Sequence, residues 1–164
     1  MVKITISRIN VLVGLTCLVT VLSPQLCHAQ APPAAGDRPK VTLRERAVRG
    51  DADAQFNLAK MYEAGRGGLK RDYTEAERWH RKAAEQGDAY AQASLGILLR
   101  FGKGIAQDYV EAYKWFQLAV SQTSGGEQES ILELRDSIAA RMTPEQITEA
   151  KRLARDWKPK LNPQ

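Results

Sequence analysis

A few residues in this chain have side chains or spacings that are typical of catalytic or ligand-binding chemistry. His80 is a candidate general base, and Glu75 and Glu77 form a pair of neighbouring carboxylates. The segments Gly65-Arg66-Gly67 and Gly102-Lys103-Gly104 contain glycines at a spacing that occurs in phosphate-binding loops. Each of these features also has a purely structural interpretation, and the surrounding sequence favours it.

These residues do not form the convergent set of groups that a catalytic site needs. Two residues apart on an expected helix, Glu75 and Glu77 do not face each other. The glycine pairs lack the Lys-Ser/Thr ending of a phosphate loop, and they recur at the same position in both copies of the repeat, where a helix is expected to end. His80 occupies the repeat position of Phe116, which favours a packing role. The sequence therefore predicts no catalytic residue, no cofactor and no metal site.

The composition is that of an ordinary globular protein. The chain has 164 residues, a formal net charge of +5 and 43% hydrophobic residues. Lysine and arginine number 24 against 19 acidic residues, so the basicity is modest and mixed in sign, and nucleic acid is not an expected partner. Trp79, Trp115 and Trp157 lie in alanine-rich stripes and are expected in the core.

The first 29 residues are typical of a secretory signal peptide. Lys3 and Arg8 precede an apolar stretch over residues 9–22, and Cys27-His28-Ala29 provides small residues at the −3 and −1 positions. Cleavage after Ala29 would remove both cysteines and one of the two histidines. The sequence predicts a periplasmic or secreted protein without stable membrane insertion after cleavage, and the alternative is a retained membrane anchor.

Residues 30–40 contain three prolines without periodicity, which predicts a disordered leader. Neither Cys17 nor Cys27 has the preceding residues of a lipidation site.

The rest of the chain contains an internal repeat. Gly50-Asp51-Ala52-Asp53-Ala54-Gln55 recurs as Gly87-Asp88-Ala89-Tyr90-Ala91-Gln92 at an offset of 37 residues. The offset becomes 36 for a second block that contains Asp72, Tyr73, Glu75, Ala76, Trp79 and Ala83 and its copy Asp108, Tyr109, Glu111, Ala112, Trp115 and Ala119. Such a period predicts stacked units, each too small to bury its apolar face alone.

Each repeat is predicted to form two helices. The first helix carries one apolar stripe and ends at the glycine pair, and the stripes are Ala54, Leu58, Met61 and Tyr62 in one copy and Ala91, Leu95, Leu98 and Leu99 in the other. The second helix opens with Asp72-x-x-Glu75 or Asp108-x-x-Glu111, which predicts two capping boxes. The fold class is therefore all-α, a short α-solenoid of antiparallel helix pairs over residues 41–158.

The flanking segments are predicted to cap the solenoid. Residues 41–50 form a half-repeat before repeat one (51–87) and repeat two (88–122). After a break at Ser124–Gly126, a divergent helix pair covers residues 126–158, and residues 159–164 form a tail. Several bases lie off the apolar stripe of the last helix, which is typical of a solvated outer face, with an anionic partner as the alternative: Arg141, Lys151, Arg152, Arg155 and Lys158.

The repeated string Gly-Asp-Ala-x-Ala-Gln-x-x-Leu, Gly-x-Gly, Asp-Tyr-x-Glu-Ala-x-x-Trp-x-x-x-Ala resembles the Sel-1-like repeat, a relative of the tetratricopeptide repeat. The ending Met142–Trp157 resembles the terminal helix of exported bacterial proteins of this family. The resemblance implies a protein-binding scaffold or adaptor, with protein partners in the cell envelope. Some exported relatives are cysteine-rich and linked to β-lactams, so an envelope hydrolase is the alternative function.

The partner is expected on the face of the first helices, which is concave in such solenoids. Four positions on this face, spaced 3-4-3, differ between the copies, as ligand-binding positions can: Asp53, Phe56, Lys60 and Glu63, matched by Tyr90, Ala93, Ile97 and Arg100. The alternative is that flanking helices bury them.

Overall fold

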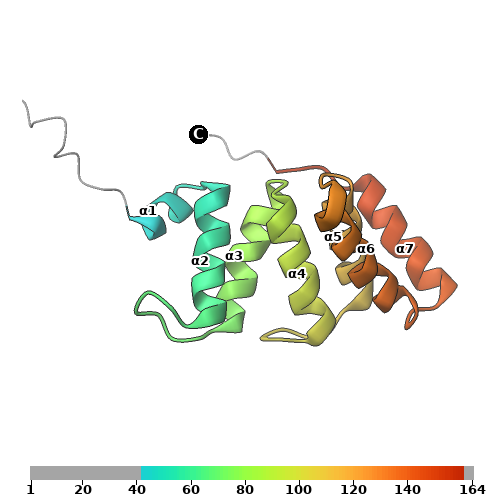
Figure 1. Ribbon diagram of the computed structural model, residues 1–164, viewed down its shortest axis with the longest axis horizontal. Coiled ribbons are helices and arrows are strands. Elements are labelled where there is room, and N and C mark those ends of the chain that lie inside the picture. Colours follow the sequence, from blue (N-terminus) through green and yellow to red (C-terminus); the bar gives the residue numbers. More distant parts are fainter. Residues whose placement is uncertain (1–41, 161–164) are drawn as a thin grey trace, which may run out of the picture. The chain divides into compact units, whose positions relative to one another are not determined.

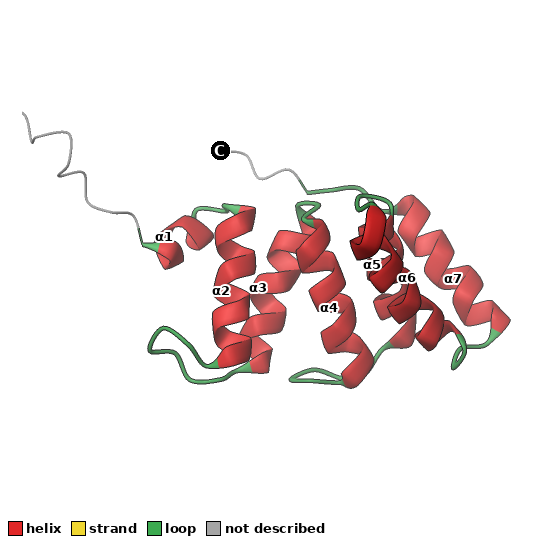
Figure 2. Ribbon diagram, viewed as in Figure 1, coloured by secondary structure: helices red, strands yellow, loops and turns green. Residues whose placement is uncertain are grey.

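The computed structural model describes residues 42–160 (Figures 1 and 2). The predicted signal peptide, the whole predicted leader (30–40) and the last four residues lie outside this range. Within it all regular structure is helical, which confirms the predicted all-α solenoid. The helices are α1 (Leu43–Val48), α2 (Ala52–Ala64), α3 (Tyr73–Glu85), α4 (Ala89–Phe101), α5 (Tyr109–Val120), α6 (Gly125–Ala139) and α7 (Pro144–Asp156).

The repeated polar residues begin the repeat helices. Asp51 and Asp88 accept hydrogen bonds from the backbone N–H groups of Ala54 and Ala91 at the N-termini of α2 and α4. Both helices end in a glycine with left-handed backbone, Gly65 in the first copy and its counterpart in the second. The two copies therefore begin and end alike because the same local hydrogen bonds are encoded twice.

The two predicted capping boxes form only in part. Asp72 and Asp108 accept first-turn N–H groups of α3 and α5, as predicted. Glu75 does not complete its box, because it accepts instead from Trp79 Nε1 at 3.1 Å. Glu111 is paired with Lys114 at 2.9 Å. Nearby donors on the same helix attract both carboxylates away from the N-cap.

The core lies between consecutive helices. The helices α2 and α3 form one close pair and α4 and α5 a second, and α3 packs on α4 to join them. Ala76, Ala83 and Ala112 are fully buried, so helix axes approach closely, and Trp79 and Trp115 are 3% and 2% exposed, which confirms their placement in the core. Each pair thus covers the apolar face of its neighbour.

The last two helices depart from this pairing. Both α6 and α7 pack on α5, while any contact between α6 and α7 is slight. The break expected at Ser124–Gly126 is shorter than predicted, since α6 already begins at Gly125 with Gly126 inside it. The C-terminal helices therefore cover α5 from two sides rather than forming a third close pair.

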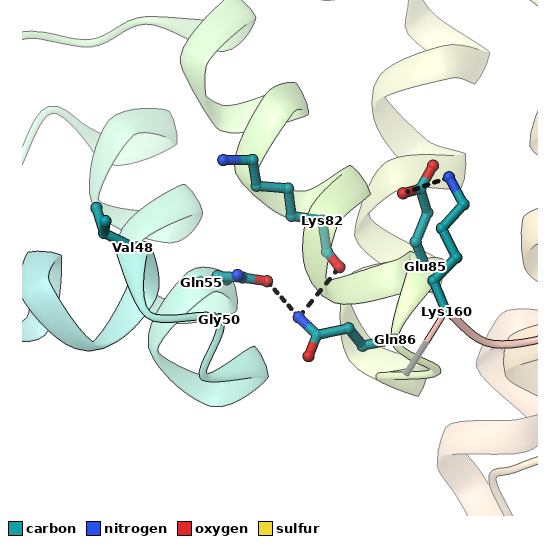
Figure 3. A pocket seen from close by; sticks show the side chains of 7 residues that line it. All are labelled: Val48, Gly50, Gln55, Lys82, Glu85, Gln86 and Lys160. Atoms are coloured by element: carbon teal, nitrogen blue, oxygen red, sulfur yellow. Dashed lines mark hydrogen bonds and ion pairs between the residues drawn. The ribbon is translucent and has the colours of Figure 1, made fainter. Parts of the chain in front are cut away.

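Glutamines join successive repeats in a recurring pattern. The side-chain amides of Gln55, Gln92 and Gln128 donate to the carbonyl oxygens of Ala47, Ala84 and Val120, each eight residues earlier. In the first two copies the glutamine oxygen also accepts from another glutamine, Gln86 or Gln122 (the first pair is drawn in Figure 3). The start of α6 therefore repeats one hydrogen bond of the junctions that begin α2 and α4, the one from the glutamine amide to the earlier carbonyl.

Residues 157–160 leave α7 and run back along the solenoid towards the α3–α4 turn (Figure 1). Trp157 meets Trp115 edge to face, with ring centroids 6.2 Å apart. Lys160 donates its backbone N–H to Glu85 O at 2.7 Å, and its ammonium lies 3.0 Å from the Glu85 carboxylate (Figure 3). We call residues 157–160 the strap.

Candidate binding pocket between α2 and α4

A pocket of about 320 Å³ lies where the C-terminal halves of α2 and α4 meet the start of α3. This volume is in the range of small binding pockets in proteins. Its wall combines apolar, hydroxyl and charged side chains from three helices and one loop: Lys60, Glu63, Ala64, Tyr73, Ser94, Ile97, Leu98 and Lys103.

Lys103 is positioned by the loop that follows α4. Gly104 has a positive φ of 75°, and a Cβ there would lie 2.6 Å from the backbone carbon of Tyr73, so only glycine fits. Thr74 Oγ1 donates to the Gly104 carbonyl at 3.2 Å. The loop is therefore held against the start of α3, and the Lys103 ammonium lies 5.6 Å from the centre of the Tyr73 ring.

The charges in the pocket are only partly matched. Lys60 lies 2.6 Å from the Glu63 carboxylate, whose other oxygen is 3.4 Å from Nε2 of the fully buried His80. Partial burial alone would raise the pKa of Glu63, but His80 and Lys60 outweigh it and lower this pKa to about 2. Lys103 has no carboxylate within ion-pair distance among the described residues. The pocket therefore keeps one cation available to an incoming group.

The eight residues predicted on this face have different environments. Lys60, Glu63 and Ile97 line the pocket. Phe56 is half-buried, 5.5 Å from the His80 ring and 6.2 Å from the Tyr90 ring, and Ala93 also packs on the core. The remaining three lie nearer the surface: Asp53 is exposed, Tyr90 donates its hydroxyl to Glu127, and Arg100 lies over the Phe101 ring.

Tyr73, Ser94 and Lys103 line the pocket but were not among the predicted binding residues. Tyr73 is half-buried at the first position of α3. The signal for Lys103 is its position between two glycines, where the other copy also has a base, Arg66. That position can be recognised as exposed and cationic, but not as facing α3.

Over residues 42–160, no three His, Cys, Asp or Glu side chains lie close enough together to hold a metal ion. In the same range no helix has the length and apolar character needed to cross a membrane.

The sequence matches the Sel1 repeat at residues 52–88 and 89–124. The chain contains two Sel1 repeats. Their boundaries lie within two residues of those predicted from the internal identities. Sel1 repeats are protein-interaction repeats.

This chain matches only a small part of the curated relatives with related sequence. The localization factor PodJL of Caulobacter vibrioides, from strain NA1000/CB15N and from strain ATCC 19089, is 52% identical over 46 residues. That match covers 27% of this chain and 5% of PodJL. The likeness is therefore one of repeats rather than of whole proteins.

A solved structure shows the same helical fold. The crystal structure of c5321, described as a protective antigen of uropathogenic Escherichia coli strains with an SLR fold, superposes with a TM-score of 0.63 at 34% identity, over 70% of this chain and 24% of c5321. A Sel1 repeat protein from Oxalobacter formigenes is 28% identical, with a TM-score of 0.49, over 70% of this chain and 52% of that protein.

Proposed function

We propose that this protein is an exported, non-enzymatic adaptor that binds a protein partner of the cell envelope through the α2–α4 pocket. The observation that carries the proposal is the pocket itself, which lies on the face predicted to bind and contains three of the predicted residues. Ile97 and Leu98 provide an apolar wall, and Lys103 provides a cation without a carboxylate partner among the described residues.

The pocket suits a segment of a partner protein that presents an apolar side chain next to a carboxylate. The apolar group would displace water from Ile97, and the carboxylate would approach Lys103. Because Lys60 is already paired with Glu63, Lys103 is the residue on which charge recognition would depend.

Affinity capture from envelope extract of the native host tests this function, with the full chain as bait. Lys103→Glu and Ser94→Trp, which reverse the charge and fill the pocket, should each abolish enrichment of the captured protein. Arg66→Glu is the matched control, because Arg66 occupies the same repeat position but does not line the pocket. Equal capture by all four proteins, at unchanged helical content, would rule out this pocket.

Export is tested separately by the N-terminus of the protein isolated from cells. The small-x-small ending at Cys27-His28-Ala29 supports cleavage before Gln30. Mass spectrometry of the envelope or culture fraction should therefore find a first residue at or near Gln30. An intact N-terminus on membrane-bound protein would instead indicate a retained anchor.

A further inference from the structure

A second pocket lies between α5, the second helix of repeat two, and α7. Its volume is about 460 Å³. Leu118 and Ala154, each 8% exposed, contribute its apolar floor. Ser121 and Thr148 lie at its edge and are exposed. The pocket exists because α7 packs on α5 instead of pairing closely with α6.

The bases of α7 divide into two groups around this pocket. Arg152 is engaged by two carboxylates, Glu149 at 2.6 Å and Asp156 at 2.9 Å. Lys151 and Arg155 line the pocket and are exposed, and no carboxylate of the described residues lies within ion-pair distance of either. The pocket therefore has an apolar floor and a rim whose positive charge is not neutralised.

We propose that the α5–α7 pocket is a second binding site, which takes an acidic amphipathic segment of a partner protein. An apolar side chain of the segment would rest on Leu118 and Ala154, and its acidic groups would pair with Lys151 and Arg155. A helix laid in a groove between two helices is a common mode of peptide recognition. The site is independent of the α2–α4 pocket, with which it shares no residue.

The surroundings favour a peptide over a polyanionic surface. Nucleic acids and anionic membranes attract broad basic patches. On α7 the two rim bases are interspersed with Glu145, Glu149 and Asp156, so the positive charge is confined to the pocket. A short segment with a few carboxylates matches that distribution, whereas a continuous negative surface would also meet the acidic side chains.

The test measures binding of a fluorescein-labelled helical peptide of Glu, Ala and Leu, with its leucines on one face, to the full chain at low salt. Lys151→Glu with Arg155→Glu should weaken binding at least about tenfold, because two surface ion pairs become repulsive. Arg152→Glu is the matched control on the same helix and should change binding little. Thr148→Trp, which fills the pocket without changing charge, should also weaken binding.

Three outcomes would overturn the proposal. The first is absence of measurable binding of this peptide to the unmodified chain. The second is equal binding of a peptide in which serine replaces leucine, since that would show attraction of charge alone. The third is binding to phosphatidylglycerol vesicles, lost in the double variant, without peptide binding, which would assign the bases to a membrane surface. Because the α2–α4 pocket is unchanged in these variants, their effects are separable from those of Lys103→Glu.

Discussion

Phe116 of α5 packs directly against Gly96 of α4, and this contact leaves no room for a side chain at position 96. A Cβ at Gly96 would lie 2.8 Å from Cε1 of the Phe116 ring, which is completely buried. In the first repeat the corresponding positions hold Ala59 and the smaller ring of His80. The larger ring, Phe116, thus accompanies glycine, and the smaller ring, His80, accompanies alanine.

Gly96→Ala should lower the free energy of unfolding by about 1–3 kcal/mol, because the added methyl group overlaps a ring that cannot move without disturbing the core. The higher helix propensity of alanine offsets part of this loss. Urea denaturation followed by circular dichroism measures the change. The control is Gly126→Ala in α6, where a Cβ meets nothing within 4 Å and stability should stay the same or rise slightly. Equal effects of the two changes would contradict the prediction.

Gln92→Ala should cost about 1–3 kcal/mol of unfolding free energy, because it removes the hydrogen bond from a completely buried side chain to the Ala84 carbonyl, which keeps the Gly87 N–H as a donor. It also removes the acceptor for Gln122. Gln107→Ala removes a hydrogen bond to Arg100 O that is exposed to water, and it should change stability by less than about 0.5 kcal/mol. Chemical denaturation of both variants checks the ranking, and the reverse order would show that the glutamine junction contributes little.

Glu63→Gln should change stability in a pH-dependent way. The pKa of Glu63 is lowered from 4.5 to about 2, so its charged form stabilises the fold fully above pH 4.5. This contribution is lost as the pH falls from 4.5 towards 2. The difference in unfolding free energy between the unmodified chain and the variant should therefore shrink over that interval. Urea titrations at a series of pH values measure it, and a difference independent of pH would contradict the assigned contacts with Lys60 and His80.

Trp115→Ala should cost about 3–5 kcal/mol, because it empties a large volume between helix pairs. Trp115 is 2% exposed and also supports Trp157 in the strap. Trp157→Ala should cost less, since Trp157 is only partly buried. Thermal melts of the two variants provide the comparison. If Trp115→Ala leaves the melting temperature unchanged, the core lies elsewhere.

Local structure was largely predictable, whereas contacts between repeats were not. The caps at Asp51 and Asp88 depend on residues three positions away, so the sequence pattern contains them. The packing of α7 on α5 depends on tertiary contacts that no periodicity encodes. Gln128 lies 36 residues after Gln92, and this spacing is the one feature of the sequence that could have predicted the glutamine hydrogen bond at the start of α6.

Differences between the two copies on the predicted binding face do not by themselves indicate a ligand. At one position the first copy has the larger residue, Phe56 against Ala93. At the other the second copy has it, Phe116 against His80. Since Phe56 contacts His80, these differences between the copies reflect compensated packing as much as freedom to bind a ligand. Ile97 and Lys60 keep their place at the pocket, because they lie further along α2 and α4.

The strap has a consequence for how the described domain unfolds. A stack held only by contacts between neighbours can fray from either end, one unit at a time. Here Lys160 is bonded to Glu85, so loosening of α7 also removes contacts from the end of α3, more than 70 residues earlier in the sequence. This long-range link couples the end of the stack to its middle. It favours a single cooperative transition over stepwise fraying, at the cost of slower folding through a higher contact order.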